Sequence, residues 1–458
     1  MDNKTVDVTR LIDDKPISRF QLGVFLLCAM VVFLDGIDYQ IIGLAAPLLI
    51  GELGIARSSL GLVFSAGTLG AAIGALSCGL IADRFGRKRV LIATTMLFGL
   101  ATVATASATG LSSLALVRFV TGLGLGGAVP CLVALTSEYA PKARRATIVS
   151  LLWAAFPLGA TIGGFVNAYL IHQHGWRTLF YVWGLAPVLA GVVLIVCLPE
   201  SVRFLLARGA RQQAVAAIVA RITGQRSEGS TFVTTDEHLA GMPIKHLFKD
   251  GRAMGTLPLW AAMFVVLGSL MVITAWTPTL ITPHGFTPAD AAMIIGINSM
   301  GSFIGTCSAG WLIERIGVAR CVIPAFIGSA IGVIFFGNAV ASFEGLAMCS
   351  FAVGICLGIS SSSGIALSVL VYPTAVRSSG IGLAMAMGRF GAVFAPLAVG
   401  LMVSRNASVG DVFFAVSMAL LLAVPCIWLL AVYSKRRALL APQEAPTVAL
   451  VAGHESAV

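Results

Sequence analysis

Charged residues are scarce in this sequence. Asp, Glu, Lys and Arg make up only 11% of its 458 residues and hydrophobic residues make up 58%, whereas soluble globular proteins carry about 25% charged residues. This composition excludes a soluble enzyme. The nine cysteines lack any C-x-x-C spacing and lie mostly in apolar runs, so we interpret them as packing residues rather than disulfides or metal ligands. We expect neither a metal nor a cofactor.

The N-terminus also lacks the features of a signal peptide. Residues 1–19 contain charges of both signs, and no short apolar core with a small-residue cleavage site follows the first charges. We therefore expect these residues to form a retained cytosolic tail.

Long apolar runs, in contrast, fill most of the chain. A helix needs about 20 apolar residues to cross a bilayer, and these runs are too long and too uniformly apolar for the alternating strands of a membrane barrel. We predict an all-α membrane protein whose twelve transmembrane helices cover residues 20–50, 58–82, 89–109, 111–138, 147–171, 178–198, 255–282, 289–313, 319–341, 345–371, 379–404 and 411–433.

The basic residues orient these spans. An even number of spans places both termini on one side, and that side receives every Lys and Arg except Arg57, Arg118, Arg177, Arg389 and Arg405. Because cytoplasmic loops are enriched in Lys and Arg, we predict cytoplasmic termini. The formal net charge of +10 then reflects membrane topology, and we expect a lipid bilayer around the protein and no nucleic-acid partner.

A polar stretch divides the spans into two sets of six. We predict pseudo-symmetric halves over residues 20–198 and 255–434, a cytosolic central loop over 199–254 and a cytosolic tail over 435–458 that is disordered from Ala441. The halves share a pattern, because GLIADRFGRKRV follows the second span of the first half and GWLIERIGVARC follows the second span of the other. Parallel repeats of this kind are a transporter architecture with a binding site near the midplane.

The central loop shows no discernible core, which disfavours a membrane sensor that would use this loop as its output. Its segment ARGARQQAVAAIVARI predicts a basic helix suited to the anionic inner leaflet. Elsewhere, residues 122–127 match G-x-G-x-x-G, which binds a dinucleotide where it follows a strand. Here the motif lies inside an apolar helix, so we expect its glycines to let a neighbouring helix approach closely.

Several motifs together resemble a known family. One set resembles the signature of the major facilitator superfamily: GLIADRFGRK after the second span, Arg118 ahead of the glycine series, Pro157 with Gly159, Gly163 and Gly164, and Leu198-Pro-Glu-Ser. A second set is similar to its aromatic acid:H⁺ symporter family, and within it to the 4-hydroxybenzoate and protocatechuate transporters: IDDKPISRFQ, Asp35-Gly-Ile-Asp38, Ser137-Glu-Tyr139, Tyr372-Pro-Thr-Ala-Val-Arg377 and Gly388-Arg-Phe-Gly391.

The resemblance implies a secondary active transporter of a bacterial inner membrane. It would take up an aromatic acid of the 4-hydroxybenzoate, protocatechuate or benzoate type together with protons, by alternating access. The alternatives are the same fold carrying another organic anion, such as a sugar acid or a dicarboxylate, and a drug/H⁺ antiporter. A channel is disfavoured because the two halves form a repeat rather than a pore ring. We expect a monomer, since one chain carries both halves of its site.

Four ionisable residues stand out inside the predicted spans, away from the span ends, where charge is costly and functional by default. Asp35 and Asp38 are three residues apart and share a helix face. Two carboxylates in a low-dielectric site resist joint ionisation, so we predict that this pair couples the proton; the alternative is that each neutralises a buried arginine. Arg118 and Arg389 present planar guanidinium groups that match a carboxylate. Either could bind the substrate, and Arg118 could instead pair with an aspartate.

Five further charges at the predicted cytoplasmic ends are candidate gate residues. Asp83, Arg84 and Arg87 belong to the basic loop motif, and we expect their ion pairs to latch helix ends. Glu138 lies beside basic residues and is either a gate carboxylate or a solvated surface charge. Arg377 is either a gate residue or an ordinary basic anchor. Aromatic residues are excluded from the predicted site, because most aromatics in membrane helices serve packing or interface roles.

Overall fold

Twelve long helices dominate the structure. The computed structural model describes residues 5–208, 212–223, 231–233, 248, 253–338, 342–372 and 377–440. Within these residues, twelve helices are long and apolar enough to cross a membrane, which confirms the predicted all-α membrane fold. The first six are α2 (Arg19–Leu53), α3 (Leu60–Phe85), α4 (Arg87–Thr105), α5 (Leu111–Tyr139), α6 (Arg145–His174) and α7 (Trp176–Cys197). The second six are α10 (Ala253–Ile281), α11 (Pro288–Ile316), α12 (Val318–Asn338), α13 (Phe343–Val371), α14 (Arg377–Ser404) and α15 (Val409–Leu440).

The predicted spans match these helices closely at most ends. The largest difference is in α15, which continues to Leu440 rather than ending at residue 433. Lys435, Arg436 and Arg437 are good helix formers, so the helix extends beyond its apolar part. The predicted disordered tail from Ala441 lies outside the described residues.

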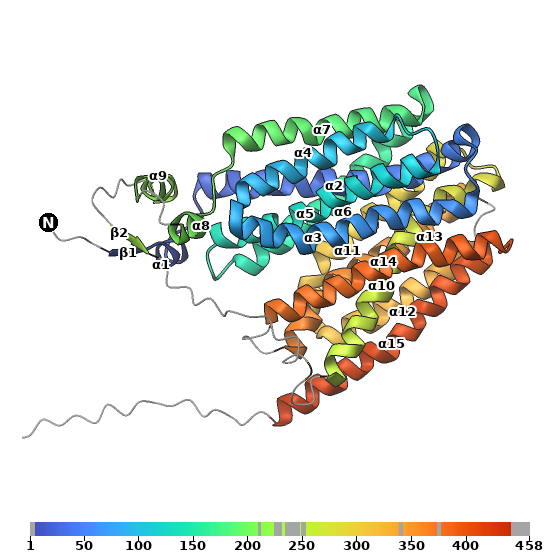
Figure 1. The fold of residues 1–458 in the computed structure, drawn as a ribbon. Coiled ribbons are helices and arrows are strands. Elements are labelled where there is room, and N and C mark those ends of the chain that lie inside the picture. Colours follow the sequence, from blue (N-terminus) through green and yellow to red (C-terminus); the bar gives the residue numbers. More distant parts are fainter. Residues whose placement is uncertain are drawn as a thin grey trace, which may run out of the picture.

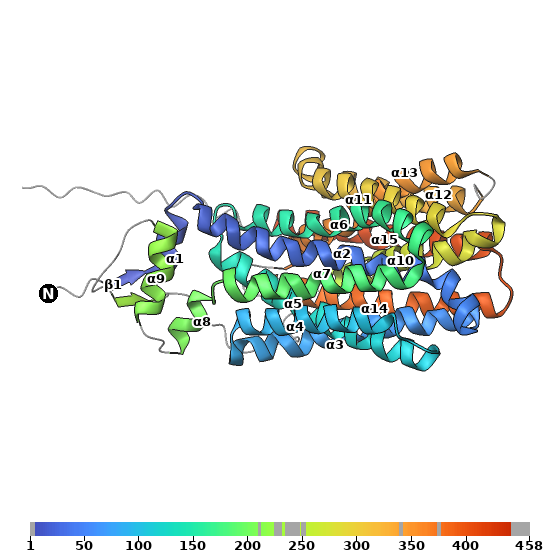
Figure 2. The ribbon, with the colours of Figure 1, turned by 90° about the horizontal axis from the view of Figure 1, so that it is seen from above.

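The two sets of six helices form two groups that lie side by side (Figures 1 and 2). Corresponding helices pack in each group: α3 on α5 in the first, and α11 on α13 in the second. Gly122 and Gly126 of α5 lie against the α3 backbone so closely that even a methyl group would overlap it. Gly301 and Gly305 of α11 meet the α13 backbone in the same way. The glycine motif therefore serves close helix packing, as its context predicts.

Helix α3 contacts α10 and α14 of the second group toward one end of the bundle. We call the end where α2 begins and α15 ends the basic end, and its opposite the far end. Near the far end, the Ser65 hydroxyl of α3 donates a hydrogen bond to the Val393 carbonyl of α14 over 2.6 Å. The Phe64 ring stands edge-on to Trp276 of α10, with centroids 5.5 Å apart. Toward the basic end, the ribbons of α10 and α15 diverge from the first group (Figure 1).

The basic end of the first group carries a small folded unit, which we call the cap. It consists of β1 (Thr5–Asp7), α1 (Val8–Asp13), α8 (Val202–Ala207), α9 (Gln212–Thr223) and β2 (Thr231–Val233), and β1 pairs in parallel with β2. Apolar side chains from these elements are buried in one cluster: Val8, Ile12, Val202, Val215, Val219, Ile222 and Phe232.

The cap corrects two expectations. The sequence predicts a central loop without a core, yet five of its apolar residues are buried because the N-terminal segment, distant in sequence, supplies the other side of the cluster: Val202, Val215, Val219, Ile222 and Phe232. Helix α9 forms within the predicted basic segment, but its apolar residues Val215 and Val219 are at most 1% exposed. That face is therefore covered by protein and is not available to a lipid leaflet.

Candidate substrate and proton site

Asp38 and Arg118 form a buried ion pair. Arg118 Nη2 lies 2.9 Å from Asp38 Oδ2, and Nη1 lies 3.5 Å from Oδ1. The Thr102 hydroxyl donates a second hydrogen bond to Oδ1 over 2.9 Å. Helices α2, α4 and α5 therefore meet at one carboxylate, which is fully buried. Of the two partners that the sequence left open for Arg118, the structure shows the aspartate.

Asp35 has different surroundings although it lies one turn away on α2. It is only half-buried, and its charged neighbours are Arg389 of α14 and Asp38. No direct ion pair joins Asp35 to Arg389 in the described part of the chain. A carboxylate and a guanidinium from opposite helix groups thus act on each other electrostatically without being locked together.

Tyr39 lies beside these two charges. It follows Asp35 by four residues, which places both on one face of α2, and it lies near Asp35 and Arg389. Its ring stands edge-on to Phe156 of α6, with centroids 5.3 Å apart. The close approach of the two helices needs Gly36, because a side chain there would overlap the Phe156 backbone. Tyr39 is absent from the predicted site, and its spacing from Asp35 is the signal that identifies it.

Three of the five predicted gate residues meet at the basic end: Asp83, Arg87 and Glu138. Glu138 contacts Arg87 in an ion pair, and the Ser201 hydroxyl donates to Glu138 Oε2 over 2.5 Å. The Glu138 side chain is only 6% exposed, which excludes the alternative of a solvated surface charge. Asp83 is largely exposed and lies 3.9 Å from Arg87, one turn along the chain.

Two other predicted gate residues stand apart from this cluster. The Arg84 guanidinium lies over the ring of Phe85, 5.6 Å from its centroid, and the Arg84 carbonyl accepts a hydrogen bond from Arg208. Arg377 begins α14, and its side chain lies outside the described part of the structure.

The cluster also contains Glu200 and Ser201, which are absent from the predicted gate. Glu200 Oε1 accepts hydrogen bonds from the backbone N–H groups of Lys88 and Ser201, over 3.0 and 2.9 Å. Both residues belong to the Leu198-Pro-Glu-Ser motif. In the sequence analysis this motif indicates only the family. A polar pair directly after an apolar span is nevertheless a signal of a contact at a helix end.

The family is decided by comparison with known proteins. A model described as Major Facilitator Superfamily matches residues 28–308 and 280–454. The chain belongs to this superfamily. Among curated relatives of this facilitator, the 4-hydroxybenzoate transporter PcaK of Acinetobacter baylyi is 36% identical, over 85% of this chain and 86% of that protein. The gallate transporter of Pseudomonas putida is 34% identical, over 87% and 89% of the two chains.

Two further comparisons agree with this assignment. The 3-(3-hydroxy-phenyl)propionate transporter of Escherichia coli is 33% identical to this facilitator, over 88% of this chain and 92% of that protein. The solved structure of the E. coli xylose transporter XylE, in a partially occluded inward open conformation, superposes with a TM-score of 0.71 at 20% identity. The match covers 90% of this facilitator and 98% of XylE.

The predicted family and fold are thus confirmed. The facilitator is a multi-pass membrane transporter and not an enzyme. The paired charges Asp38 and Arg118, and the facing charges Asp35 and Arg389, all lie within the stretches that the superfamily model matches.

Proposed function

We propose that this facilitator takes up an aromatic carboxylate together with protons by alternating access. The observation that carries the proposal is that Asp35 of α2 and Arg389 of α14, two charges from opposite helix groups, lie near enough to act on each other, with the Tyr39 ring one helical turn from Asp35. The relatives named as transporters of 4-hydroxybenzoate, gallate and 3-(3-hydroxy-phenyl)propionate favour the same class of cargo.

The charges supply a coupling step. While Asp35 is ionised, it neutralises Arg389 and competes with any other anion for that guanidinium. Protonation of Asp35 removes this competitor, so Arg389 becomes available to the substrate carboxylate through its planar fork of donors. The substrate ring then packs against Tyr39 and Phe156, which form an aromatic pair. The proton therefore binds first and the aromatic acid second, and the two cross the membrane together.

Asp38 and Arg118 offer a second step of proton coupling. A proton on Asp38 would weaken its ion pair and free Arg118, which otherwise holds α5 to α2. We propose that this pair transmits protonation to the packing of the first helix group, and that the substrate carboxylate binds Arg389 rather than Arg118.

Membrane orientation follows from the basic residues. We propose that the basic end faces the cytoplasm of a bacterial inner membrane, with both termini inside. Residues 20–198 and 255–434 are the proposed halves, which rock around the site as one monomer. Contacts at the far end then correspond to an inward-facing state. The proposed gate residues line the cytoplasmic ends of the helices: Asp83, Arg84, Arg87, Glu138 and Arg377.

The decisive experiment is uptake of radiolabelled 4-hydroxybenzoate by cells that express the protein. We expect uptake to be lost with a protonophore and in an Asp35→Asn variant, because each removes the proton step. Asp14→Asn is the matched control, since it makes the same change at an exposed residue outside the spans. Inhibition of uptake by unlabelled benzoate separates this proposal from a drug/H⁺ antiporter.

One outcome would contradict the proposed cargo. If the protein is verified in the membrane and takes up none of 4-hydroxybenzoate, benzoate, gentisate, vanillate or protocatechuate, the aromatic-acid proposal is wrong. Uptake that persists at full rate in the Asp35→Asn variant would instead contradict the coupling role of Asp35 while leaving the cargo intact.

A further inference from the structure

The cap plays no part in the proposed transport step, yet it is bonded directly to the gate. Ser201 donates a hydrogen bond to Glu138 Oε2 and accepts one from the Phe204 backbone N–H over 3.0 Å. Ser201 is therefore also the N-cap residue of α8. The Tyr139 hydroxyl donates to the Glu200 carbonyl over 2.8 Å, which adds a second bond between α5 and the entry to α8. The position of the gate carboxylate therefore depends on the position of α8.

Helix α8 in turn depends on the N-terminal segment. It has six residues, too few for a helix to be stable without tertiary packing. Its residue Val202 is buried in the same cluster as Val8 and Ile12 of α1, which are 3% and 6% exposed. The pairing of β1 with β2, which sets Val6 opposite Phe232, ties α1 to the part of the chain that follows α9.

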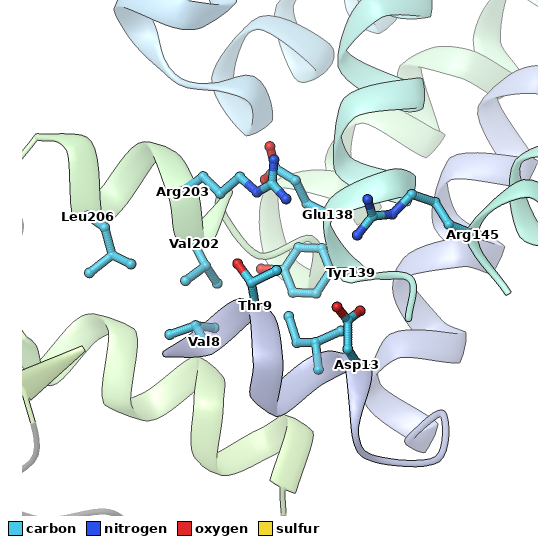
Figure 3. Close-up of a pocket in the computed structure, with 10 residues that line it drawn as sticks. Val8, Thr9, Asp13, Glu138, Tyr139, Arg145, Val202, Arg203 and Leu206 are labelled. Atoms are coloured by element: carbon cyan, nitrogen blue, oxygen red, sulfur yellow. The ribbon is translucent and has the colours of Figure 1, made fainter. Parts of the chain in front are cut away.

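A separate bond ties the N-terminal segment to the turn after α5. Asp13 Oδ1 accepts a hydrogen bond from the Lys142 backbone N–H over 2.7 Å. Figure 3 shows α1, α8 and the end of α5 around a small cavity, with Val8 and Val202 on one side and Glu138 and Tyr139 on the other. The cavity measures about 20 Å³, which is room for about one water molecule. The segment thus fits closely against the gate.

We propose that Thr5–Asp13 is a positioning element for the gate. By clamping α8 against the end of α5, it keeps Ser201 on Glu138 and Glu138 on Arg87 while the helix groups move. The inference rests on the proposed function, because Glu138 and Arg87 form a gate only in a transporter that alternates. A positioning role differs from a purely stabilising role in one respect. The segment would affect transport only through Glu138.

The first experiment is a double-mutant cycle on uptake of 4-hydroxybenzoate. Val8→Asp places a charge in the clamp, and Ala217→Asp is the matched control because Ala217 of α9 is exposed. We expect Val8→Asp to lower the maximal rate about tenfold with KM unchanged, and to cause no further loss in a Glu138→Gln background. Ala217→Asp should leave the rate unchanged, and Val8→Ile should retain it.

The second measurement needs no substrate. Backbone hydrogen exchange of the purified full-length protein should be faster over residues 137–145 in Val8→Asp, and unchanged there in Ala217→Asp. Val8→Ala, which removes two methyl groups and adds no charge, replaces Val8→Asp if that variant does not insert. If Glu138→Gln itself abolishes uptake, or if the wild-type protein transports none of the acids, this exchange pattern alone tests the positioning role.

Two results would overturn the positioning role. One is an equal loss of rate from Val8→Asp in the wild-type and Glu138→Gln backgrounds, which would show that the segment acts independently of Glu138. The other is unchanged exchange over residues 137–145 in every Val8 variant. Failure of the cargo proposal is a separate result, because it appears as an absence of uptake by the wild-type protein.

Discussion

Two aspartates one turn apart on α2 have different surroundings. Asp38 receives three donor groups from Arg118 and Thr102 and is fully buried, whereas Asp35 is half-buried and faces Arg389 without a direct ion pair. The three-residue spacing rotates one side chain by about 60° from the other around the helix. One carboxylate therefore points into its own helix group, and the other points toward the opposite group.

This contrast predicts unequal effects on stability. Asp38→Asn should lower the free energy of unfolding strongly, because it leaves Arg118 buried without its counter-charge, a loss that costs about 3–5 kcal/mol. Asp35→Asn is the matched control and should cost much less. Thermal unfolding of the purified variants in one detergent measures both. Equal losses at the two positions would contradict the different roles assigned to them.

Tyr39 gives a second prediction at the residue scale. Tyr39→Leu removes the ring that packs on Phe156 and should raise KM for 4-hydroxybenzoate about three- to tenfold, the factor that corresponds to one aromatic contact. Tyr39→Phe keeps the ring and should change KM less. Tyr181→Leu is the control, because Tyr181 of α7 is 49% exposed. An unchanged KM in Tyr39→Leu would exclude the aromatic slot.

At the scale of elements, glycine determines how closely α3 and α5 pack. Gly126→Ala should destabilise the protein by about 1–3 kcal/mol, because the added methyl group would overlap the Ala71 backbone. Gly79→Ala on α3 is the matched control, since its methyl group would lie 3.8 Å from Pro130, an ordinary contact. Unfolding temperature in detergent tests both, and a stable Gly126→Ala variant would contradict the packing role of this glycine.

The spanning helices and the cap were not equally predictable from sequence. Each span has its own apolar run, so its existence follows from a local property of about 20 residues. The cap depends instead on strands of three residues that are more than 200 positions apart, such as Val6 opposite Phe232. Strands so short show no periodicity of their own, so the pairing appears only when the chain is folded.

At the scale of the whole molecule, contacts at the far end define the observed state. Gly61 of α3 lies against α14, where an added Cβ would be 2.6 Å from the Pro396 carbonyl oxygen. Gly61→Trp should therefore prevent closure of the far end and abolish uptake while binding of 4-hydroxybenzoate to the purified protein remains. Gly51→Trp is the control, because a Cβ added at Gly51 would have no neighbouring side chain or helix within 4 Å. Uptake at the wild-type rate in Gly61→Trp would show that these contacts are not part of the cycle.

The sequence by itself determined the membrane class, the twelve spans, the repeat and the family. These follow from long apolar runs, from the side on which Lys and Arg gather and from motifs of adjacent residues, all of which are local or additive properties. It also selected Asp35, Asp38, Arg118 and Arg389, because a charge inside an apolar run stands out whatever it contacts.

Only the tertiary structure decided which charges are partners. Arg118 had two candidate roles, and its bond to Asp38 depends on how α2 and α5 pack. The burial of Glu138, the place of Tyr39 beside Arg389 and the clamp on α8 likewise need helices that are distant in sequence to meet. Partner choice depends on distances of a few ångströms between such helices, and no pattern along a single chain records those distances.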